Sequence, residues 1–140
     1  MKVVLDTNVF ISSFLGKGPP HQIVKRWIQG EFDLCLTNEI IEEYVEILNR
    51  AGVEDDPYVK DVLGIIKRQG NIVFSSKPVK CLVVKEDPDD DKFIACALSC
   101  GAKMIVSGDS HLLNIIKYID IEIIKARAFL SILEHKSGDI

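Results

Sequence analysis

The sequence predicts an α/β fold built around a mainly parallel β-sheet. Short, β-branched apolar runs alternate along the chain with longer amphipathic segments, which is the order that parallel strands with crossover helices require. Hydrophobic residues make up 47% of the 140 residues, which is enough for a substantial buried core. The sequence shows no internal repeat, low-complexity stretch or linker. We therefore expect one domain over residues 1–140.

The predicted strands are short and rich in Val, Ile and Leu. The first and the fourth, KVVLD and KMIVSGD, both end on an acidic residue. The predicted strands cover residues 2–6, 32–37, 71–75, 103–109 and 121–124, and a weaker extended segment covers 79–84.

Helices are predicted where apolar residues recur at helical spacing between capping residues and Gly or Pro breaks. The clearest covers residues 38–52, with Asn38 as N-cap and Gly52 near the C-cap. The break GKGPP separates the first two helices. Further helices are predicted over residues 7–15, 21–30, 56–70, about 89–100 and 126–135, and the apolar segment 111–119 is predicted to be partly helical.

Charge and hydropathy exclude several classes of protein. The net charge is −4, so the chain is not a generally basic nucleic-acid binder, and any such contact needs a local basic surface or a bound cation. No apolar run approaches the ~20 residues needed to span a bilayer. The N-terminus reaches an acid after one Lys and three apolar residues, too early for a signal-peptide core of about 7–15 residues. We expect a cytoplasmic protein that does not associate with membranes.

The four cysteines lack the spacing of a metal site. Cys96 and Cys100 lie one helical turn apart, but no second ligand pair with zinc spacing accompanies them. Free cysteines are among the residues most often buried in protein cores. We therefore expect buried roles, with zinc binding as the weaker alternative, for Cys35, Cys81, Cys96 and Cys100.

Two acidic residues follow predicted strands where parallel α/β sheets form their sites. Asp6 comes directly after VVL, and Asp109 follows MIV across Ser107 and Gly108. Sites in such sheets lie outside the carboxyl ends of the strands. The alternative is that each acid only caps the helix that follows it. The presence of both acids, each on an apolar strand, favours a functional role.

A third acidic residue of interest is Glu43, within the predicted helix over 38–52. The apolar residues of this helix form one stripe at about 100° per residue. Glu43 lies about 95–100° from the centre of the stripe, whereas the other Glu residues of the helix lie about 135–165° from it. Glu43 is therefore held at the edge of the buried face, and it is the Glu best placed to reach a site.

The segment EDPDDDKF carries five carboxylates in its first six residues. A helix N-terminus stabilises one or two acids through its free N–H groups, each by about 0.3–1 kcal/mol, but it does not explain five that repel one another. A divalent cation would remove this repulsion. Asp91 begins the first turn of the predicted helix, where its side chain can face the strand ends.

Asp6, Glu43, Asp91 and Asp109 form a candidate set of oxygen ligands without an accompanying His or Cys. Such a set suits Mg²⁺ or Mn²⁺ rather than zinc. Mg²⁺ held by few carboxylates keeps several waters and typically meets a phosphate. Such ions can orient a water and stabilise the charge of an in-line attack on phosphorus. The residues therefore indicate phosphodiester hydrolysis.

Three stretches of the chain resemble the PIN-domain nucleases: VVLDTNVFIS, LTNEIIEEYVEIL and DPDDDKFIACALSCGAKMIVSGDSHLL. The resemblance spans residues 3–133 and extends to the VapC-like toxins of toxin–antitoxin pairs. It implies a three-layer α/β/α fold with a parallel sheet of about five strands, and Mg²⁺- or Mn²⁺-dependent ribonuclease activity. It also implies a homodimer and a cognate antitoxin protein.

The resemblance also assigns roles to individual residues. His111 stands where many relatives carry a further Asp, which leaves a fifth ligand in doubt, and we place His111 at the surface. Asp90 is a close competitor of Asp91 for the third acidic position. The catalytic and metal-binding acids are then Asp6, Glu43, Asp91 and Asp109, with Asn8, Asp90 and Ser107 in support.

Single-stranded RNA is the expected substrate, because the attacked phosphate must enter a cleft. Two alternatives within the family are an RNA-processing nuclease outside a toxin system and a catalytically weak module that binds RNA or protein. A phosphatase with a nucleophilic Asp is disfavoured because Asn8, not an acid, stands two residues after Asp6. The candidate RNA contacts, each otherwise a solvated surface cation, are Lys17, Lys25, Arg26 and Lys92.

Overall fold

The computed structural model describes residues 1–76 and 91–136 of the chain. Its sheet has six strands in the order β3-β2-β1-β4-β6-β5, and every neighbouring pair is parallel except β5 with β6. The predicted fold class, α/β with a mainly parallel sheet, is confirmed. The strands are β1 (Lys2–Leu5), β2 (Asp33–Thr37), β3 (Ile72–Ser75), β4 (Met104–Val106), β5 (Lys117–Tyr118) and β6 (Ile121–Ile124).

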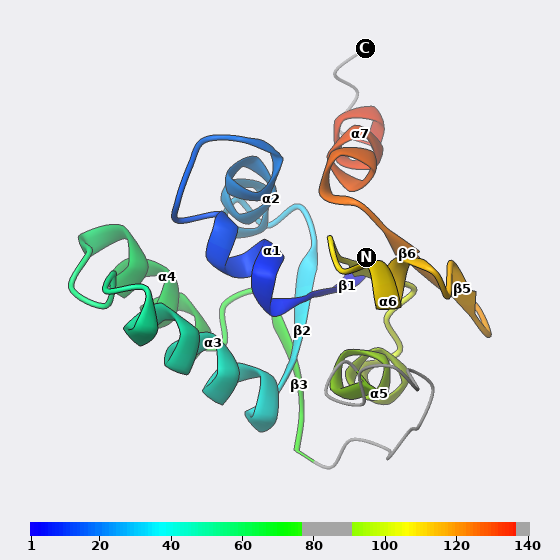
Figure 1. The fold of residues 1–140 in the computed structure, drawn as a ribbon, viewed down its shortest axis with the longest axis horizontal. Coiled ribbons are helices and arrows are strands. Elements are labelled where there is room, and N and C mark those ends of the chain that lie inside the picture. The colour runs from blue at the N-terminus through cyan, green and yellow to red at the C-terminus, as the bar shows by residue number, and fades with distance from the viewer. Residues whose placement is uncertain (77–90, 137–140) are drawn as a thin grey trace.

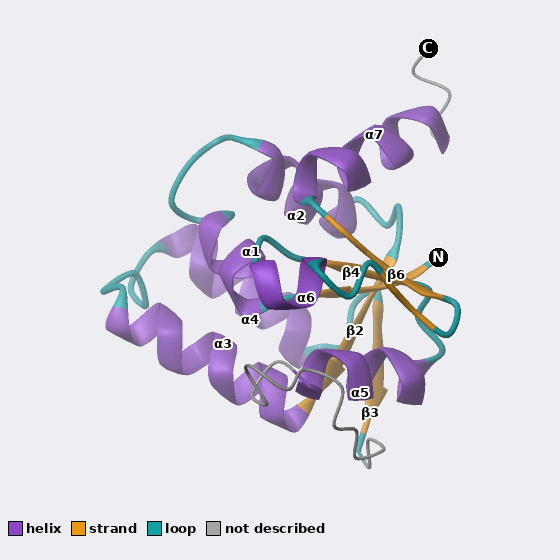
Figure 2. Ribbon diagram, turned by 45° about the vertical axis from the view of Figure 1, so that its right-hand side comes forward, coloured by secondary structure: helices purple, strands orange, loops and turns teal. Residues whose placement is uncertain are grey.

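Helices cover both faces of the sheet. Figure 1 shows α1 to α4 on one side of the central strands and α5 on the other, and α5 packs against β1, β2, β3 and β4. Figure 2 shows α7 lying beside α2. Phe129 of α7 also packs edge-to-face on Phe32, which precedes β2. The helices are α1 (Thr7–Ser12), α2 (Pro19–Ile28), α3 (Asn38–Arg50), α4 (Pro57–Lys67), α5 (Asp91–Cys100), α6 (Ser110–Leu113) and α7 (Ala126–Lys136).

The structure differs from the sequence-based prediction in two places. The sheet has a sixth strand, because the segment predicted as partly helical ends its helix at Leu113 and then forms β5, which pairs with β6 as an antiparallel hairpin. Ile116 and Ile119 have φ angles of 62° and 57°, and this backbone conformation cannot continue a helix. The N-cap of α3 is Thr37, not Asn38, because the Thr37 hydroxyl accepts the N–H of Ile40 at 3.2 Å. Segment 79–84 and the first residues of the helix predicted over 89–100 lie outside the described residues.

The core lies on both faces of β1 and β2, whose apolar side chains are fully buried as parallel strands covered on both sides require. The predicted burial of the cysteines is confirmed for the three that the structure describes. Cys35, Cys96 and Cys100 are buried and free, whereas Cys81 lies outside the described residues. Within residues 1–76 and 91–136, no helix is both long and apolar enough to cross a membrane.

Tyr44 ties α3 to the end of β1. Its ring is fully buried and stacks on Phe10 of α1, with ring centroids 4.0 Å apart and planes 8° apart. Its hydroxyl donates a hydrogen bond to the carbonyl of Leu5, the residue before Asp6. One side chain therefore fixes the distance between α3, α1 and the carboxyl end of β1, where the predicted site begins.

Replacement of Tyr44 by Phe should lower the free energy of unfolding by about 0.5–1.5 kcal/mol, because it deletes a buried hydrogen bond without changing the ring stack. Urea unfolding followed by circular dichroism measures this loss.

Tyr58→Phe is the matched control. The Tyr58 hydroxyl is buried and has no hydrogen-bond partner among the described residues, so its removal should leave stability unchanged or raise it. Equal destabilisation by the two variants would contradict a structural role for the Tyr44 hydroxyl.

Candidate active site

Asp6 is a buried carboxylate at the junction of β1 and α1. Its backbone N–H donates to the carbonyl of Val106 at 3.0 Å, which extends the pairing of β1 with β4 by one residue. One carboxylate oxygen, Oδ1, accepts the N–H of Val9 at 2.8 Å and caps α1. The other oxygen, Oδ2, accepts the hydroxyl of Ser107. Only 2% of the residue is exposed, so neighbouring groups and these hydrogen bonds hold the carboxylate in place.

Ser107 joins Asp6 to Asp109. Its hydroxyl donates to Asp6 and accepts the backbone N–H of Asp109 at 2.9 Å. Asp109 in turn caps α6, because its Oδ1 accepts the N–H of His111 at 2.7 Å. Both acids therefore act as helix caps, and the capping accounts for one oxygen of each. Capping does not explain why a buried serine joins the carboxylate of Asp6 to the backbone of Asp109 at the ends of adjacent strands.

The pKa of the Asp6 carboxyl lies above its usual value. Burial is the main cause, because removal from water disfavours the charged form. Hydrogen bonds from Ser107 and from the N–H of Val9 lower the pKa, and the negative charge of Asp109 raises it. A cation bound beside Asp6 and Asp109 would relieve both the repulsion and the cost of burial.

Glu43 approaches the same region from α3. Its carboxylate accepts a hydrogen bond from the hydroxyl of Thr7, the residue after Asp6. It also forms an ion pair with Lys92 of α5, with Nζ and Oε1 2.7 Å apart. Glu43 lies at the edge of the buried face, as its place on the helix predicts: its side chain is 29% exposed and contacts Thr7 and Lys92.

Asp91 is the first residue of α5 and is buried. It precedes Lys92, so the start of α5 supplies both an acid and the cation that pairs with Glu43. Asp90, its predicted competitor, lies outside the described residues. The predicted helper Asn8 is exposed on α1, whereas Ser107 is completely buried between the acids.

The predicted RNA contacts fall into two groups. Lys17 and Lys25 are exposed. Arg26 pairs with Glu31 at 2.9 Å, and Lys92 is only 11% exposed and is engaged by Glu43. These ion pairs compete with any contact of Arg26 or Lys92 to RNA.

His111 stands beside Asp109 at the start of α6. Its Nδ1 lies 3.8 Å from Oδ1 of Asp109, and its side chain is 42% exposed. The residue is therefore partly exposed, and it lies beside one of the acids, Asp109.

Three residues near the acids were missed by the sequence-based prediction. Thr7 holds Glu43, and Lys125 and Arg127 line a pocket of about 300 Å³ together with Asn8 and Ser107. Lys125 directly follows β6, so the rule that identified Asp6 and Asp109 at strand ends would also have found it.

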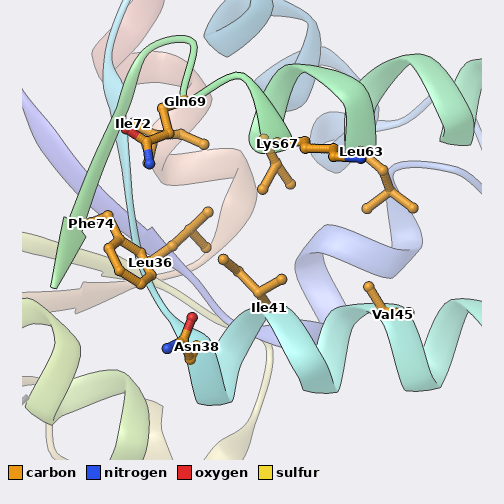
Figure 3. A pocket seen from close by; sticks show the side chains of 10 residues that line it. Leu36, Asn38, Ile41, Val45, Leu63, Lys67, Gln69, Ile72 and Phe74 are labelled. Carbon is orange, nitrogen blue, oxygen red and sulfur yellow. The ribbon is translucent and has the colours of Figure 1, made fainter. Parts of the chain in front are cut away.

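A second pocket lies away from the acids. It has a volume of about 340 Å³ and lies between α3, α4 and the strands β2 and β3. Figure 3 shows Leu36, Ile41 and Phe74 facing one another across it. No acidic residue of the described part of the chain lines it. Ile41 and Val45 project from α3 on a different side from Glu43, so this apolar pocket is separate from the candidate site.

The residues fit a hard divalent cation by their chemistry. The predicted ligands are all carboxylates, and the nearby hydroxyls of Thr7 and Ser107 add further oxygens. Within the described ranges, no three acidic, His or Cys side chains are arranged to hold a metal ion as they stand. Glu43 is paired with the ammonium group of Lys92. Asp6 and Asp109 are the pair that Ser107 already holds together.

A parallel sheet flanked by helices, with carboxylates gathered at the carboxyl ends of its strands, defines an α/β protein with a strand-end active site. The PIN domain family model matches residues 2–111, so this chain belongs to the PIN-domain family. PIN domains are generally nucleases that use divalent metals, and the family therefore indicates a nuclease. Comparisons with curated proteins and with solved structures gave no match.

Replacement of Asp6 by Asn should stabilise the metal-free protein relative to wild type as the pH rises. Folding raises the pKa of Asp6, so the wild type loses stability as the pH rises from the pKa of the unfolded chain through that of the folded chain. At lower pH the carboxyl is protonated in both states and has no effect. The free energy of unfolding, variant minus wild type, should therefore increase between pH 4 and pH 8 in urea titrations with EDTA.

Asp61→Asn, at an exposed position on α4, controls for the loss of one negative charge and should show no such increase. A difference for Asp6→Asn that falls with pH would mean that burial does not dominate the electrostatics of this carboxylate.

Proposed function

We propose that this protein is a Mg²⁺- or Mn²⁺-dependent endoribonuclease that hydrolyses single-stranded RNA. The observation that carries the proposal is the buried Asp6 carboxylate, joined through Ser107 to Asp109 at the carboxyl ends of β1 and β4. Burial of a carboxylate is costly unless a positive charge or hydrogen bonds offset it. A protein retains such a group readily where a cation and a phosphate must meet.

Four acids would hold the metal: Asp6, Asp109 and Asp91 directly, and Glu43 either directly or through a water. When bound, a divalent cation polarises the phosphate and lowers the pKa of a coordinated water. Hydrolysis then breaks the bond from phosphorus to the 3′-oxygen and leaves 5′-phosphate and 3′-hydroxyl ends.

The chain's own residues keep these acids in place. Ser107 holds Asp6 and Asp109 together, and the helix caps fix which oxygen of each faces away from the backbone. Thr7 holds Glu43 beside Asp6, while Lys92 neutralises Glu43 and thereby reduces repulsion among the acids. Residues that orient metal ligands typically change metal affinity or activity by about 10–100-fold when they are removed.

We further propose that the protein is the toxin of a toxin–antitoxin pair. In this role it would be a cytoplasmic homodimer that a cognate antitoxin protein inhibits. The support for this role is the similarity of LDTN, NEIIEEYVEIL and DDDKF to VapC-like toxins. An RNA-processing nuclease outside a toxin system would use the same acids, so the biological role requires a separate test.

Purified protein should cleave labelled single-stranded RNA with Mn²⁺ or Mg²⁺ and should lose this activity in EDTA. Asp6→Asn should reduce the rate at least about 100-fold, because it removes one ligand charge and weakens metal binding. Denaturing gel electrophoresis and end analysis measure the rate and the 5′-phosphate product.

Asp61→Asn again serves as the control for charge and should cleave like wild type. Cleavage that persists in EDTA or in Asp6→Asn would rule out a metal-dependent reaction at these acids. RNA binding without cleavage in any metal would favour a catalytically weak binding module.

Induced expression of the wild-type chain in a bacterium without an antitoxin should arrest growth, whereas expression of Asp6→Asn to the same level should not. The expected difference follows from loss of the RNA-cleaving site and is measured as colony counts after induction. Normal growth with an active wild-type enzyme would favour RNA processing over a toxin role.

A further inference from the structure

A pocket with two cationic residues in its lining lies next to the acids at the same edge of the sheet, between α1 and the start of α7. Its volume is about 300 Å³. The polar residues that line it are Asn8, Ser12, Ser107, Lys125 and Arg127. The cations that the sequence predicted to contact RNA do not lie in this lining. The two cations in the lining, Lys125 and Arg127, come after β6 in the chain.

The strand pairing places this pocket relative to Asp6. β1, β4 and β6 are adjacent parallel strands, and their carboxyl ends lead into Asp6, Ser107 and Lys125. The N–H of Asp6 donates to Val106, and the N–H of Ser107 donates to Ile124 at 2.9 Å, so the three ends stay in register. With about 4.8 Å between neighbouring strands, the backbone of Lys125 lies about 10 Å from that of Asp6.

Lys125 and Arg127 remain available to a ligand. Both are exposed, and neither forms an ion pair within residues 1–76 and 91–136. Arg26, Lys92 and Lys103, by contrast, pair with Glu31, Glu43 and Asp120. Asn8 and Ser12 also line the pocket, and none of its lining residues within the described ranges is acidic.

An anionic substrate needs such a pocket. The chain has a net charge of −4, and its candidate catalytic groups are acids, so the site itself repels a polyanion. Two cations one strand beyond Ser107 attract the backbone without neutralising Asp6. Arginine binds phosphate through two parallel hydrogen bonds, and lysine binds it as a point charge.

We propose that the pocket formed by Asn8, Ser12, Lys125 and Arg127 binds a backbone phosphate of the RNA, a few nucleotides at most from the phosphate that is cleaved. This inference rests on the proposed function, because it takes RNA as the substrate. Lys125 and Arg127 are positioning residues in this scheme. They hold the strand so that the scissile phosphate reaches the acids.

The test measures binding of a fluorescent single-stranded RNA in EDTA, where no cleavage occurs, by anisotropy at several salt concentrations. The double variant Lys125→Ala/Arg127→Ala should bind at least about fivefold more weakly at 0.1 M salt. The slope of log affinity against log salt should fall by about 0.7 for each cation that neutralises a phosphate. With Mn²⁺ present, KM should rise more than kcat falls.

Lys67→Ala/Arg68→Ala is the matched control, since it removes one Lys and one Arg that are exposed at the end of α4, just before β3 begins. This end of the sheet is opposite to Asp6. Lys125→Arg/Arg127→Lys should restore the salt slope and most of the affinity, because both charges are kept. Melting temperatures of all variants show that each is folded.

Two outcomes separate this inference from the proposed function. If wild type cleaves RNA and Lys125→Ala/Arg127→Ala binds it like the Lys67/Arg68 control, the pocket is not a phosphate site and the nuclease proposal stands. If wild type binds RNA through Lys125 and Arg127 but cleaves none in Mn²⁺ or Mg²⁺, the pocket proposal stands and the nuclease proposal fails.

Discussion

The buried carboxylate of Asp6 is the constraint on which the rest of the site depends. One of its oxygens caps α1 and the other accepts Ser107, so it joins β1, α1 and the end of β4 in a single cluster. The cost of its burial is visible in its raised pKa. The surrounding residues are arranged to meet that cost with hydrogen bonds, and the proposed cation would meet the remainder.

Charge is divided across the carboxyl edge of the sheet. Acids follow β1 and β4 and approach from α3 and α5, whereas Lys125 and Arg127 follow β6. Ser107 lies at the boundary, because it donates a hydrogen bond to Asp6 and also lines the pocket of Lys125 and Arg127. In the proposed scheme, this separation would let the acids hold a cation and Lys125 and Arg127 hold a backbone phosphate, without mutual neutralisation of these side chains.

Helix α3 shows how one element serves several purposes. Tyr44 packs in the core and bonds the end of β1, Glu43 turns toward Thr7 and Lys92, and Ile41 and Val45 line the apolar pocket of Figure 3. The three directions follow from the helical repeat, because consecutive residues of an α-helix point about 100° apart around its axis. The core contact of Tyr44 therefore determines where Glu43 can reach.

Local patterns in the sequence were enough to predict the α/β class, most of the elements, the strand-end positions of Asp6 and Asp109, and the place of Glu43 at the edge of a buried face. Each depends on neighbours within a few residues, through strand and helix periodicity. The catalytic roles of these acids stay predictions.

Other features depend on contacts between residues that are far apart in the chain. The hydrogen bond from Ser107 to Asp6 joins residues 101 positions apart. The Thr7–Glu43–Lys92 cluster and the pocket of Lys125 and Arg127 also join separate elements. The sixth strand likewise depends on pairing with β6. Periodicity carries no information about such partners, because strand order and helix packing bring them together only in the folded chain.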